Sequence, residues 1–271
     1  MDNDDLPIGR VLDRRDAVKL LAITGAAVLV GCNRSSAASS DTSLAASNEA
    51  SGAAAQPVPG CIVRPELTVG PYFVDHQLER SDITTDPGTG IASPGVPLSL
   101  TFTVSEISGG KCVPLQGAIV DVWHCDASGR YSAVNDRMEG FNTLDKKFLR
   151  GFQKTSDIGV ASFTTIYPGW YRGRTVHIHF KIRALHAGKQ YDFTSQLFFD
   201  DAFSDKIFAR APYSAKGARD MRNSGDGIFR QAGDSLLLRV GELRNNDGQL
   251  EFPYIATFDI ALDLSDARGS G

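Results

Sequence analysis

The sequence lacks the usual motifs of protein metal sites. Its 271 residues include five histidines and four cysteines, but no Cys-x-x-Cys pair and no His-Glu-x-x-His segment. The first absence argues against a structural zinc site and the second against a zinc protease. No carboxylate lies close in sequence to the paired histidines His177 and His179, which argues against an iron(II) site of two histidines and one carboxylate.

An excess of basic residues and a long hydrophobic run are also missing. Lys and Arg number 28 against 32 Asp and Glu, for a formal net charge of -4, so the chain has no charge pattern typical of nucleic-acid binding. The longest apolar run, near the N-terminus, has about a dozen residues, far fewer than the roughly 20 of a transmembrane helix. With 42% hydrophobic residues and no internal repeat, the chain can bury one sizeable core, and we expect one globular domain.

The N-terminus has the pattern of an export signal. Arg14 and Arg15 precede the apolar run, which ends in Leu29-Val30-Gly31-Cys32. A twin arginine before a short apolar segment is typical of bacterial twin-arginine signals, and the last four residues resemble a lipobox, in which the cysteine is acylated. We therefore predict a signal peptide over residues 1–31 and a lipid anchor at Cys32, which would place the protein on the periplasmic or cell-surface side of a membrane. Because Asp-Ala follows the arginines, the general secretory route stays open, as does a cleaved signal that leaves Cys32 unmodified.

Residues 32–56 are predicted to be a disordered tether. After the cysteine they are mostly Ala, Ser, Asn and Gly, with no aromatic residue, so they cannot bury enough apolar surface to offset the entropy of ordering. The folded domain is predicted over residues 57–271. In an oxidising compartment its cysteines would most simply form one disulfide and leave one thiol free, and the sequence does not choose the pair among Cys61, Cys112 and Cys125.

From Pro57 onward the chain is rich in β-branched and aromatic runs separated by Gly, Pro, Asp and Asn clusters. Such runs are typical of strands. We predict strands within 96–107, 117–125, 159–168, 175–182, 191–199 and 250–262. Several strands with few helix-length patterns favour an all-β fold of the β-sandwich type. The exceptions are residues 201–211 and 215–222, which we predict to be short helices or ordered loops.

The predicted strand at 175–182 contains the two paired histidines. Apolar and polar residues alternate along it, so the rings of His177 and His179 point to the same face, a frequent metal-ligand geometry. Tyr171 precedes the pair and Tyr131 lies upstream. Because phenolate is a hard anionic donor, two tyrosinates with two imidazoles would favour ferric iron over zinc or iron(II). Zinc or copper at the histidines, or two histidines that only pack, stay open as alternatives.

Four ordered motifs resemble those of the intradiol ring-cleavage dioxygenases. The signature of that family, an acidic and an apolar residue, six further residues and Gly-x-Tyr, matches residues 121–131. A second motif, with Pro, Tyr, Arg and His-x-His at the family's spacing, matches residues 168–179. Gly-Pro-Tyr at 70–72 and the glutamine at Gln196 complete the set.

The resemblance implies one non-haem Fe(III) per chain with four protein ligands. These are Tyr131, Tyr171, His177 and His179, with Tyr171 as the ligand released when substrate binds. The rival for the second tyrosinate is Tyr167, four residues earlier, but the spacing from the proline favours Tyr171.

The resemblance also implies a reaction and a substrate pocket. The family uses O2 to cleave a catechol-type diol between its hydroxyl-bearing carbons and yields a muconate-type dicarboxylate. Arg174 and Gln196 would stabilise negative charge on the ring. The pocket would be lined by Thr68, Gly70, Pro71 and Tyr72. The expected partners are the catechol-type substrate and O2, without nucleic acid and with a membrane only through the lipid anchor.

The sequence lacks one domain found in part of the family, and three of its histidines match no residue with a role in the family. Catechol dioxygenases have a long helical N-terminal dimerisation domain, and nothing between Pro57 and the first predicted strands is long or periodic enough to form one. A homo-oligomer therefore stays open, as does the identity of the catechol. We predict that His124 is either a packing residue or one that contacts a metal ligand without binding the metal, and that His76 and His186 lie at the surface. The competing function is a non-catalytic β-sandwich lipoprotein that binds a ligand and retains the motifs only as core.

Overall fold

The computed structural model describes residues 60–246 and 250–265. The predicted signal peptide (1–31) and tether (32–56) lie outside the described residues. The strands are β1 (Pro97–Ser108), β2 (Lys111–Pro114), β3 (Ile119–Trp123), β4 (Asn135–Asp136), β5 (Phe141–Asn142), β6 (Arg150–Lys154), β7 (Val160–Ile166), β8 (His177–His186), β9 (Lys189–Phe198), β10 (Arg239–Arg244) and β11 (Leu250–Leu262). The short helical segments are α2 (Asp201–Phe208), η2 (Tyr213–Lys216), α3 (Phe229–Ala232) and η3 (Gly233–Leu236).

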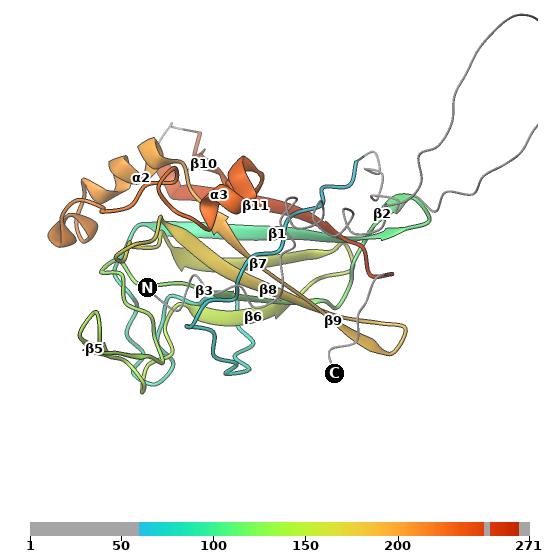
Figure 1. Cartoon of the computed structure of the whole chain (residues 1–271), viewed down its shortest axis with the longest axis horizontal. Helices are drawn as coiled ribbons and strands as arrows, with labels where there is room; N and C mark the ends of the chain where they lie inside the picture. Colours follow the sequence, from blue (N-terminus) through green and yellow to red (C-terminus); the bar gives the residue numbers. More distant parts are fainter. Residues whose placement is uncertain (1–59, 247–249, 266–271) are drawn as a thin grey trace, which may run out of the picture. The chain divides into compact units, whose positions relative to one another are not determined.

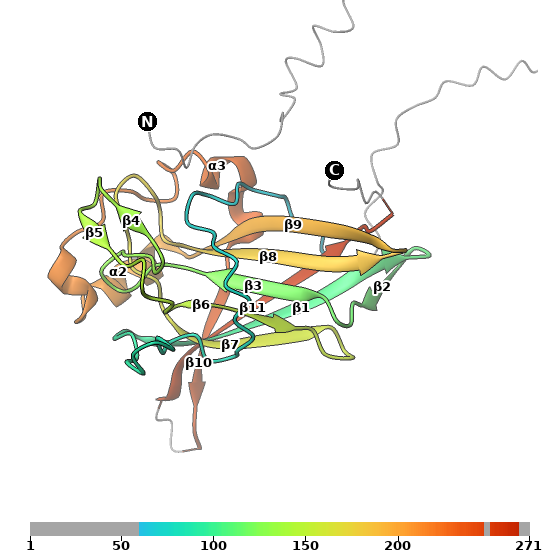
Figure 2. The same cartoon turned by 90° about the horizontal axis from the view of Figure 1, so that it is seen from below.

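Two sheets form the body of the domain (Figures 1 and 2). The five-stranded sheet has the order β10-β11-β1-β2, with β7 also paired to β1, and the four-stranded sheet has the order β6-β3-β8-β9. The pair β1–β11 is parallel, and the other described pairs of these two sheets are antiparallel. This architecture confirms the predicted all-β fold.

The main core lies between the two sheets. Because side chains alternate along a strand, β1 sends Leu98, Leu100 and Phe102 inward, and all three are fully buried. The Phe102 ring lies 5.4 Å from that of Phe180 on β8, and the Phe180 ring lies 5.4 Å from that of Phe258 on β11. These aromatic contacts hold the sheets face to face and fix which side of β8 faces the core.

The helical segments cluster near one end of the sheets. Helix α2 begins after Asp200, whose side chain accepts a hydrogen bond from the Phe203 amide at 2.8 Å and thereby caps the first turn. Helix α2 and η2 fall within or beside the two segments for which we predicted short helices or ordered loops. Figure 1 shows α2 and the β4–β5 hairpin at the end opposite to β2 and the β8–β9 turn.

The cysteine pair that the sequence left open is Cys61–Cys112, and Cys125 is a free, buried thiol. The disulfide joins the segment before the first strand to β2. Burial is the main cause that raises the pKa of the Cys125 thiol, so this residue is an unreactive packing group.

The three histidines outside the pair differ in their surroundings. His124 is fully buried, where its ring bonds to the Cys125 carbonyl at 2.8 Å and to the Thr165 hydroxyl at 2.7 Å, so it packs in the interior as predicted. His186 is exposed, also as predicted. His76 is partly exposed and so lies at the surface only in part: its Nε2 is enclosed without a hydrogen-bond partner among the described residues, because the chain before β1 folds over the four-stranded sheet.

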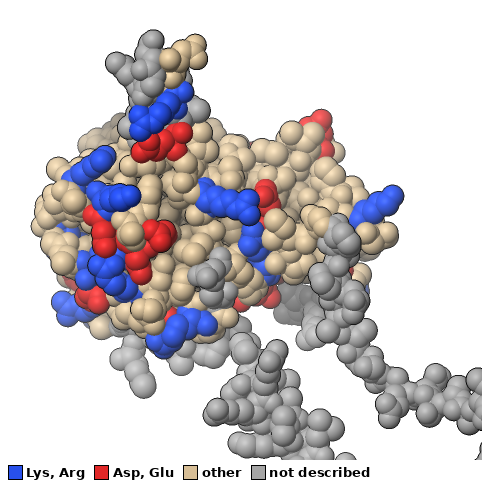
Figure 3. All heavy atoms as spheres, turned by 90° about the horizontal axis from the view of Figure 1, so that it is seen from above, with Lys and Arg blue, Asp and Glu red and all other residues tan. Residues whose placement is uncertain are grey.

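The surface of the described chain carries charges of both signs (Figure 3). Lys and Arg side chains are interspersed with Asp and Glu on the face shown in Figure 3, in line with the small net charge. Within residues 60–246 and 250–265, no helix has the length and apolar character needed to span a bilayer.

Candidate active site

Strand β8 divides its side chains between two environments. Ile178, Phe180 and Ile182 point into the main core, so His177 and His179 point to the other face of the sheet. There a second, smaller group of buried residues surrounds them, with Trp123, Cys125, Tyr131 and Tyr171 at its centre. The Trp123 ring stacks on that of His179 at 5.0 Å with an interplanar angle of 8°. The alternation predicted from the sequence therefore carries both histidines into one buried aromatic cluster.

Four polar atoms meet within this cluster. His177 Nε2 lies 3.1 Å from His179 Nε2, 3.2 Å from the Tyr171 hydroxyl and 3.4 Å from the Tyr131 hydroxyl. All four side chains are at least nine-tenths buried. The structure thus brings together the four residues that the sequence nominated as metal ligands, although their positions span nearly fifty residues of sequence. We call these residues the His-Tyr cluster.

The protonation of the histidines suits metal binding. The His177 Nδ1–H donates to the Thr175 carbonyl at 2.7 Å, which leaves the lone pair on Nε2, the nitrogen that faces the cluster. Burial, followed by the positive charge of Arg174, lowers the pKa of His177. Burial and then the His177 charge lower the pKa of His179. Both rings are therefore neutral near neutral pH, which is the form that binds metals.

A glycine lets the two tyrosine-bearing segments approach each other. Gly129 has a φ of +84°, and a Cβ atom there would lie 2.1 Å from the Trp170 carbonyl oxygen. Any side chain at this position would both strain the backbone and push away the segment that carries Tyr171. The Gly-x-Tyr motif therefore requires glycine for a steric reason: only glycine lets the segment of Tyr131 lie this close to the segment of Tyr171.

The Gly-Pro-Tyr loop, predicted to line a substrate pocket, lies against the His-Tyr cluster. A Cβ on Gly70 would lie 3.0 Å from His179 Cε1, so the loop backbone rests against that ring. The Tyr72 ring stacks on Tyr131 at 4.4 Å, and its hydroxyl donates to Asp136 Oδ2 at 2.7 Å. Pro71, in contrast, is exposed. Gly70 and Tyr72 contact the cluster directly.

Arg174 and Gln196 lie next to the cluster and contact each other. Arg174 is buried, and one guanidinium NH2 donates to Gln196 Oε1 at 2.6 Å. The Gln196 amide in turn donates to the Thr68 carbonyl at 3.2 Å, while the Thr68 hydroxyl accepts from the Gly70 amide at 3.2 Å. This chain ties the arginine to the loop over the site. Gln196 pairs with His179 across β8 and β9, so the guanidinium is held beside the metal-ligand candidates.

The charge of Arg174 is stabilised where it lies. Burial acts to lower its pKa, but the negative charges of an ionised Tyr171 and of the Asp226 carboxylate outweigh that cost and raise the pKa above its ordinary value. Arg174 is therefore a permanent buried cation, and its ion pair with Asp226 at 2.9 Å is buried as well, with side-chain exposures of 5% and 1%.

Tyr167, the rival tyrosine, is directed elsewhere. Its ring packs in the main core at 4.5 Å from that of Phe199, and its hydroxyl bonds to the Ser204 hydroxyl at 2.7 Å. The preference for Tyr171 over Tyr167 therefore agrees with the geometry.

Two charged residues at the site belong to none of the sequence motifs and were not predicted. Arg150 is buried and donates from Nη1 to the Tyr72 carbonyl at 2.6 Å and from Nε to the Ser132 hydroxyl at 2.8 Å. Its guanidinium carbon lies 6.0 Å from the Tyr131 ring centre, and burial lowers its pKa to about 10. Arg150 thereby joins the loop over the site to the segment of Tyr131.

The second charged residue without a motif is Asp226. The sequence pattern that could have indicated it is the polar turn Asn-Ser-Gly-Asp-Gly, which precedes an apolar pair.

The composition of the cluster sets it apart from common metal sites. Within the described part of the chain, no group of three or more His, Cys, Asp or Glu side chains converges to hold a metal. The donor set offered here consists of two imidazoles and two phenols.

Comparison with known proteins agrees with these observations. A family model described as Dioxygenase matches residues 68–239. An intradiol ring-cleavage dioxygenase from Tetranychus urticae is 30% identical, with a TM-score of 0.61, over 75% of this chain and 95% of that one.

Two more distant structures share the fold. One is a hydroxyquinol 1,2-dioxygenase from Pseudomonas putida DLL-E4, which is 19% identical with a TM-score of 0.52 over 75% of this chain and 68% of that one. The other is a 3-chlorocatechol 1,2-dioxygenase from Rhodococcus opacus 1CP, which is 21% identical with a TM-score of 0.50 over 76% of this chain and 75% of that one. The family match, the Tetranychus relative and the motifs lead to one conclusion: the chain belongs to the intradiol ring-cleavage dioxygenases, enzymes of the EC 1.13.11 type.

Proposed function

We propose that the protein is a non-haem Fe(III) dioxygenase. It would cleave a catechol-type diol between the two hydroxyl-bearing carbons, insert both atoms of O2 and release a muconate-type dicarboxylate. The observation that carries the proposal is the meeting of two phenol oxygens and two imidazole nitrogens in the buried His-Tyr cluster. Nothing in the comparisons or in the described residues favours the non-catalytic lipoprotein.

The donor atoms of the His-Tyr cluster fit such an ion. Enzymes of this family use non-haem iron, and Tyr131, Tyr171, His177 and His179 would hold it. Donors that bind one first-row metal ion at about 2.1 Å lie roughly 3 Å from each other, and the three separations from His177 Nε2 are 3.1 to 3.4 Å. Anionic phenolate oxygen favours a trivalent ion.

The protein groups around the cluster suit the reaction. When bound, ferric iron supplies a Lewis acid that makes both catechol hydroxyls acidic and activates the ring toward O2. The Tyr171 oxygen would accept one of the substrate's protons, because it lies in the cluster next to the site of binding. The Arg174 guanidinium, which is buried, would stabilise the negative charge that develops on the ring, because a fixed cation shielded from bulk water acts more strongly than an exposed one.

Metal analysis and product analysis test the proposed function. We expect about one iron per purified chain, a visible colour from phenolate-to-iron charge transfer, and a change of that colour when a catechol is added without O2. A panel of catechol, protocatechuate, hydroxyquinol, chlorocatechols and larger lignin-derived catechols should identify a substrate through its ring-cleavage product. A colourless protein that binds zinc or copper and cleaves no member of the panel would exclude the proposal.

We also propose that the enzyme is exported and anchored through an acylated Cys32. The twin arginine, the Leu29–Cys32 sequence and the Ala/Ser-rich tether support this location. Cys32→Ser should release the protein from the membrane fraction, whereas Cys125→Ala, which alters a buried thiol of the folded domain, should not. Mass spectrometry of the mature N-terminus checks the modification, and an unmodified Cys32 would contradict the anchor without affecting the proposed reaction.

A further inference from the structure

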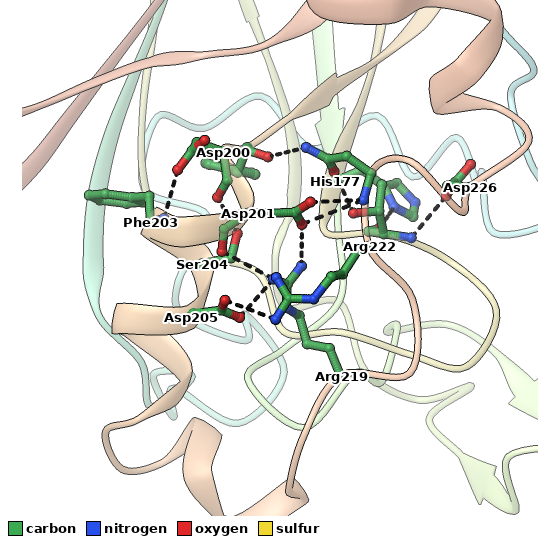
Figure 4. A network of polar contacts seen from close by, with 12 residues as sticks. His177, Asp200, Asp201, Phe203, Ser204, Asp205, Arg219, Arg222 and Asp226 are labelled. Atoms are coloured by element: carbon green, nitrogen blue, oxygen red, sulfur yellow. Dashed lines mark hydrogen bonds and ion pairs between the residues drawn. The ribbon is translucent and has the colours of Figure 1, made fainter.

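Residues 219–229 pack beside the candidate active site, and we call this segment the positioning loop. Two arginines fasten it to helix α2 (Figure 4). Arg219, whose side chain is only 3% exposed, pairs with Asp201 and Asp205 at 2.8 Å, and Arg222 pairs with Asp205 at 3.0 Å. A segment with little regular structure is thereby held in one place.

Asn223 connects the positioning loop to the strand that carries the histidines. Its side-chain amide donates to the Phe199 carbonyl at 2.8 Å, and its Oδ1 accepts from the Thr175 hydroxyl at 2.6 Å. Thr175 is also the residue whose carbonyl accepts from His177 Nδ1. The loop therefore fixes the residue that orients the His177 ring.

Asp226 makes four hydrogen bonds through its two carboxylate oxygens. Oδ2 accepts from Arg174 Nε at 2.9 Å and from the Thr175 amide at 2.8 Å. Oδ1 accepts from the amides of Ile228 and Phe229, at 2.8 and 3.0 Å, at the start of α3. The side chain is 1% exposed. One oxygen thus caps a helical turn while the other binds the backbone and side chain next to the active site.

The hydrogen bonds of Arg174 leave one nitrogen for a ligand. Nε is held by Asp226 and Nη2 by Gln196. Nη1 is buried and has no hydrogen-bond partner among the described residues. A buried donor without a partner is costly, and this one belongs to a guanidinium fixed on two sides beside His179.

We propose that Asp226 is a positioning residue that acts through Arg174: it holds the guanidinium so that Nη1 faces the substrate ring. The inference rests on the proposed function and extends it to a residue that does not contact substrate or metal. The loop from 219 to 229 then supports catalysis because it fixes Asp226 through its own ion pairs with α2.

The geometry predicts which replacements disrupt this role. Asp226→Asn replaces one of the two acceptor oxygens by an NH2 group, which is a donor. That NH2 group would face other donors in either orientation: the amides of Ile228 and Phe229, or Arg174 Nε and the Thr175 amide. Asp226→Ser is the better test, because a serine hydroxyl can still cap α3 but cannot reach Arg174 as a charged partner. The fold should therefore survive in Asp226→Ser.

Asp226→Ser is expected to lower turnover by roughly 10- to 100-fold, the cost of a misplaced catalytic group, while iron content and colour stay at the wild-type level. In an Arg174→Ala background the same replacement should cost no further turnover, because its effect passes through the arginine. Asp86→Ser is the matched control. Asp86 is also a buried carboxylate that accepts backbone amides, and it makes no described hydrogen bond or ion pair with Arg174.

Three results would overturn the proposal: turnover of Asp226→Ser within twofold of wild type, an equal loss in the Arg174→Ala background, or a loss of activity that follows a loss of iron. Thermal unfolding of the metal-free protein separates this proposal from the proposed function. Asp226→Ser and Arg174→Ala should each lower the Tm, and the double variant should lower it by less than the sum. That coupling is measurable even if the wild-type protein binds no iron, and additive shifts would count against the pairing.

Discussion

Arg174→Ala is expected to lower ring-cleavage turnover about 100- to 1000-fold, the usual cost of removing one preorganised donor from a site that excludes water. The variant should keep its iron, its colour and much of the spectral change on adding a catechol, because Arg174 is not one of the four proposed ligands. Its buried guanidinium is fixed by Asp226 and Gln196, so bulk water cannot replace its effect on the charge of the ring. Steady-state kinetics, iron analysis and anaerobic optical titration together measure these outcomes.

Two further variants sharpen this experiment. Arg174→Lys should restore only part of the turnover, because Arg174 contacts Asp226 and Gln196 through two different nitrogens of a planar fork, and the single nitrogen of a lysine on a flexible stem cannot reproduce that spacing. Arg172→Ala, which removes an exposed arginine two residues away, should leave turnover close to wild type. If Arg174→Ala with bound iron turned over as fast as Arg172→Ala, the arginine would have no part in the reaction.

Tyr131→Phe is expected to remove most of the iron and most of the visible colour. The replacement deletes one of the two proposed anionic donors, and even the loss of a group that only supports a metal ligand costs 10- to 100-fold in affinity, so we expect a loss of at least about 100-fold. Iron content by elemental analysis and the strength of the visible absorption band check this result.

The structure supplies a matched control for the tyrosine. Tyr167 is also fully buried, but its hydroxyl bonds to Ser204 and does not reach the histidines. Tyr167→Phe should therefore keep full iron and colour while it loses one hydrogen bond in the core. If the two variants behaved alike, or if Tyr131→Phe kept its full iron, the proposed ligand set would be wrong.

Much of the fold was predictable because the longer strands alternate clearly. The ends of strands β1, β7 and β8 lie one to four residues from those of the predicted ranges. Strand β2 was missed because its four residues are almost all exposed and show no pattern. Strand β6 was missed because its Arg-Gly start interrupts the apolar alternation. The order of strands, and above all the parallel pairing of β1 with β11, depends on contacts between distant residues that no local pattern records.

Some residues of the candidate site were likewise predictable from local sequence patterns, and others were not. The histidine pair follows from strand alternation, and the tyrosines follow from motif spacing. Arg150 and Asp226 could not be found by either route. Asp226 lies 52 residues beyond Arg174 in an irregular segment, and its role depends on how that segment folds back over the end of β8. Arg150 was hidden because a charged residue at the start of a short strand is ordinarily exposed.

The parallel pairing of β1 with β11 also determines when this domain can fold. Leu98 lies opposite Tyr254, and β11 occupies an inner position between β10 and β1. A nascent chain could already pair β1 with β2 and β7, but the other edge of β1 would stay without β11 until synthesis has passed residue 262, and that edge would need protection from other strands during that time. Because such long-range pairing slows folding, closure of the five-stranded sheet by β11 would be a late step in the folding of this domain.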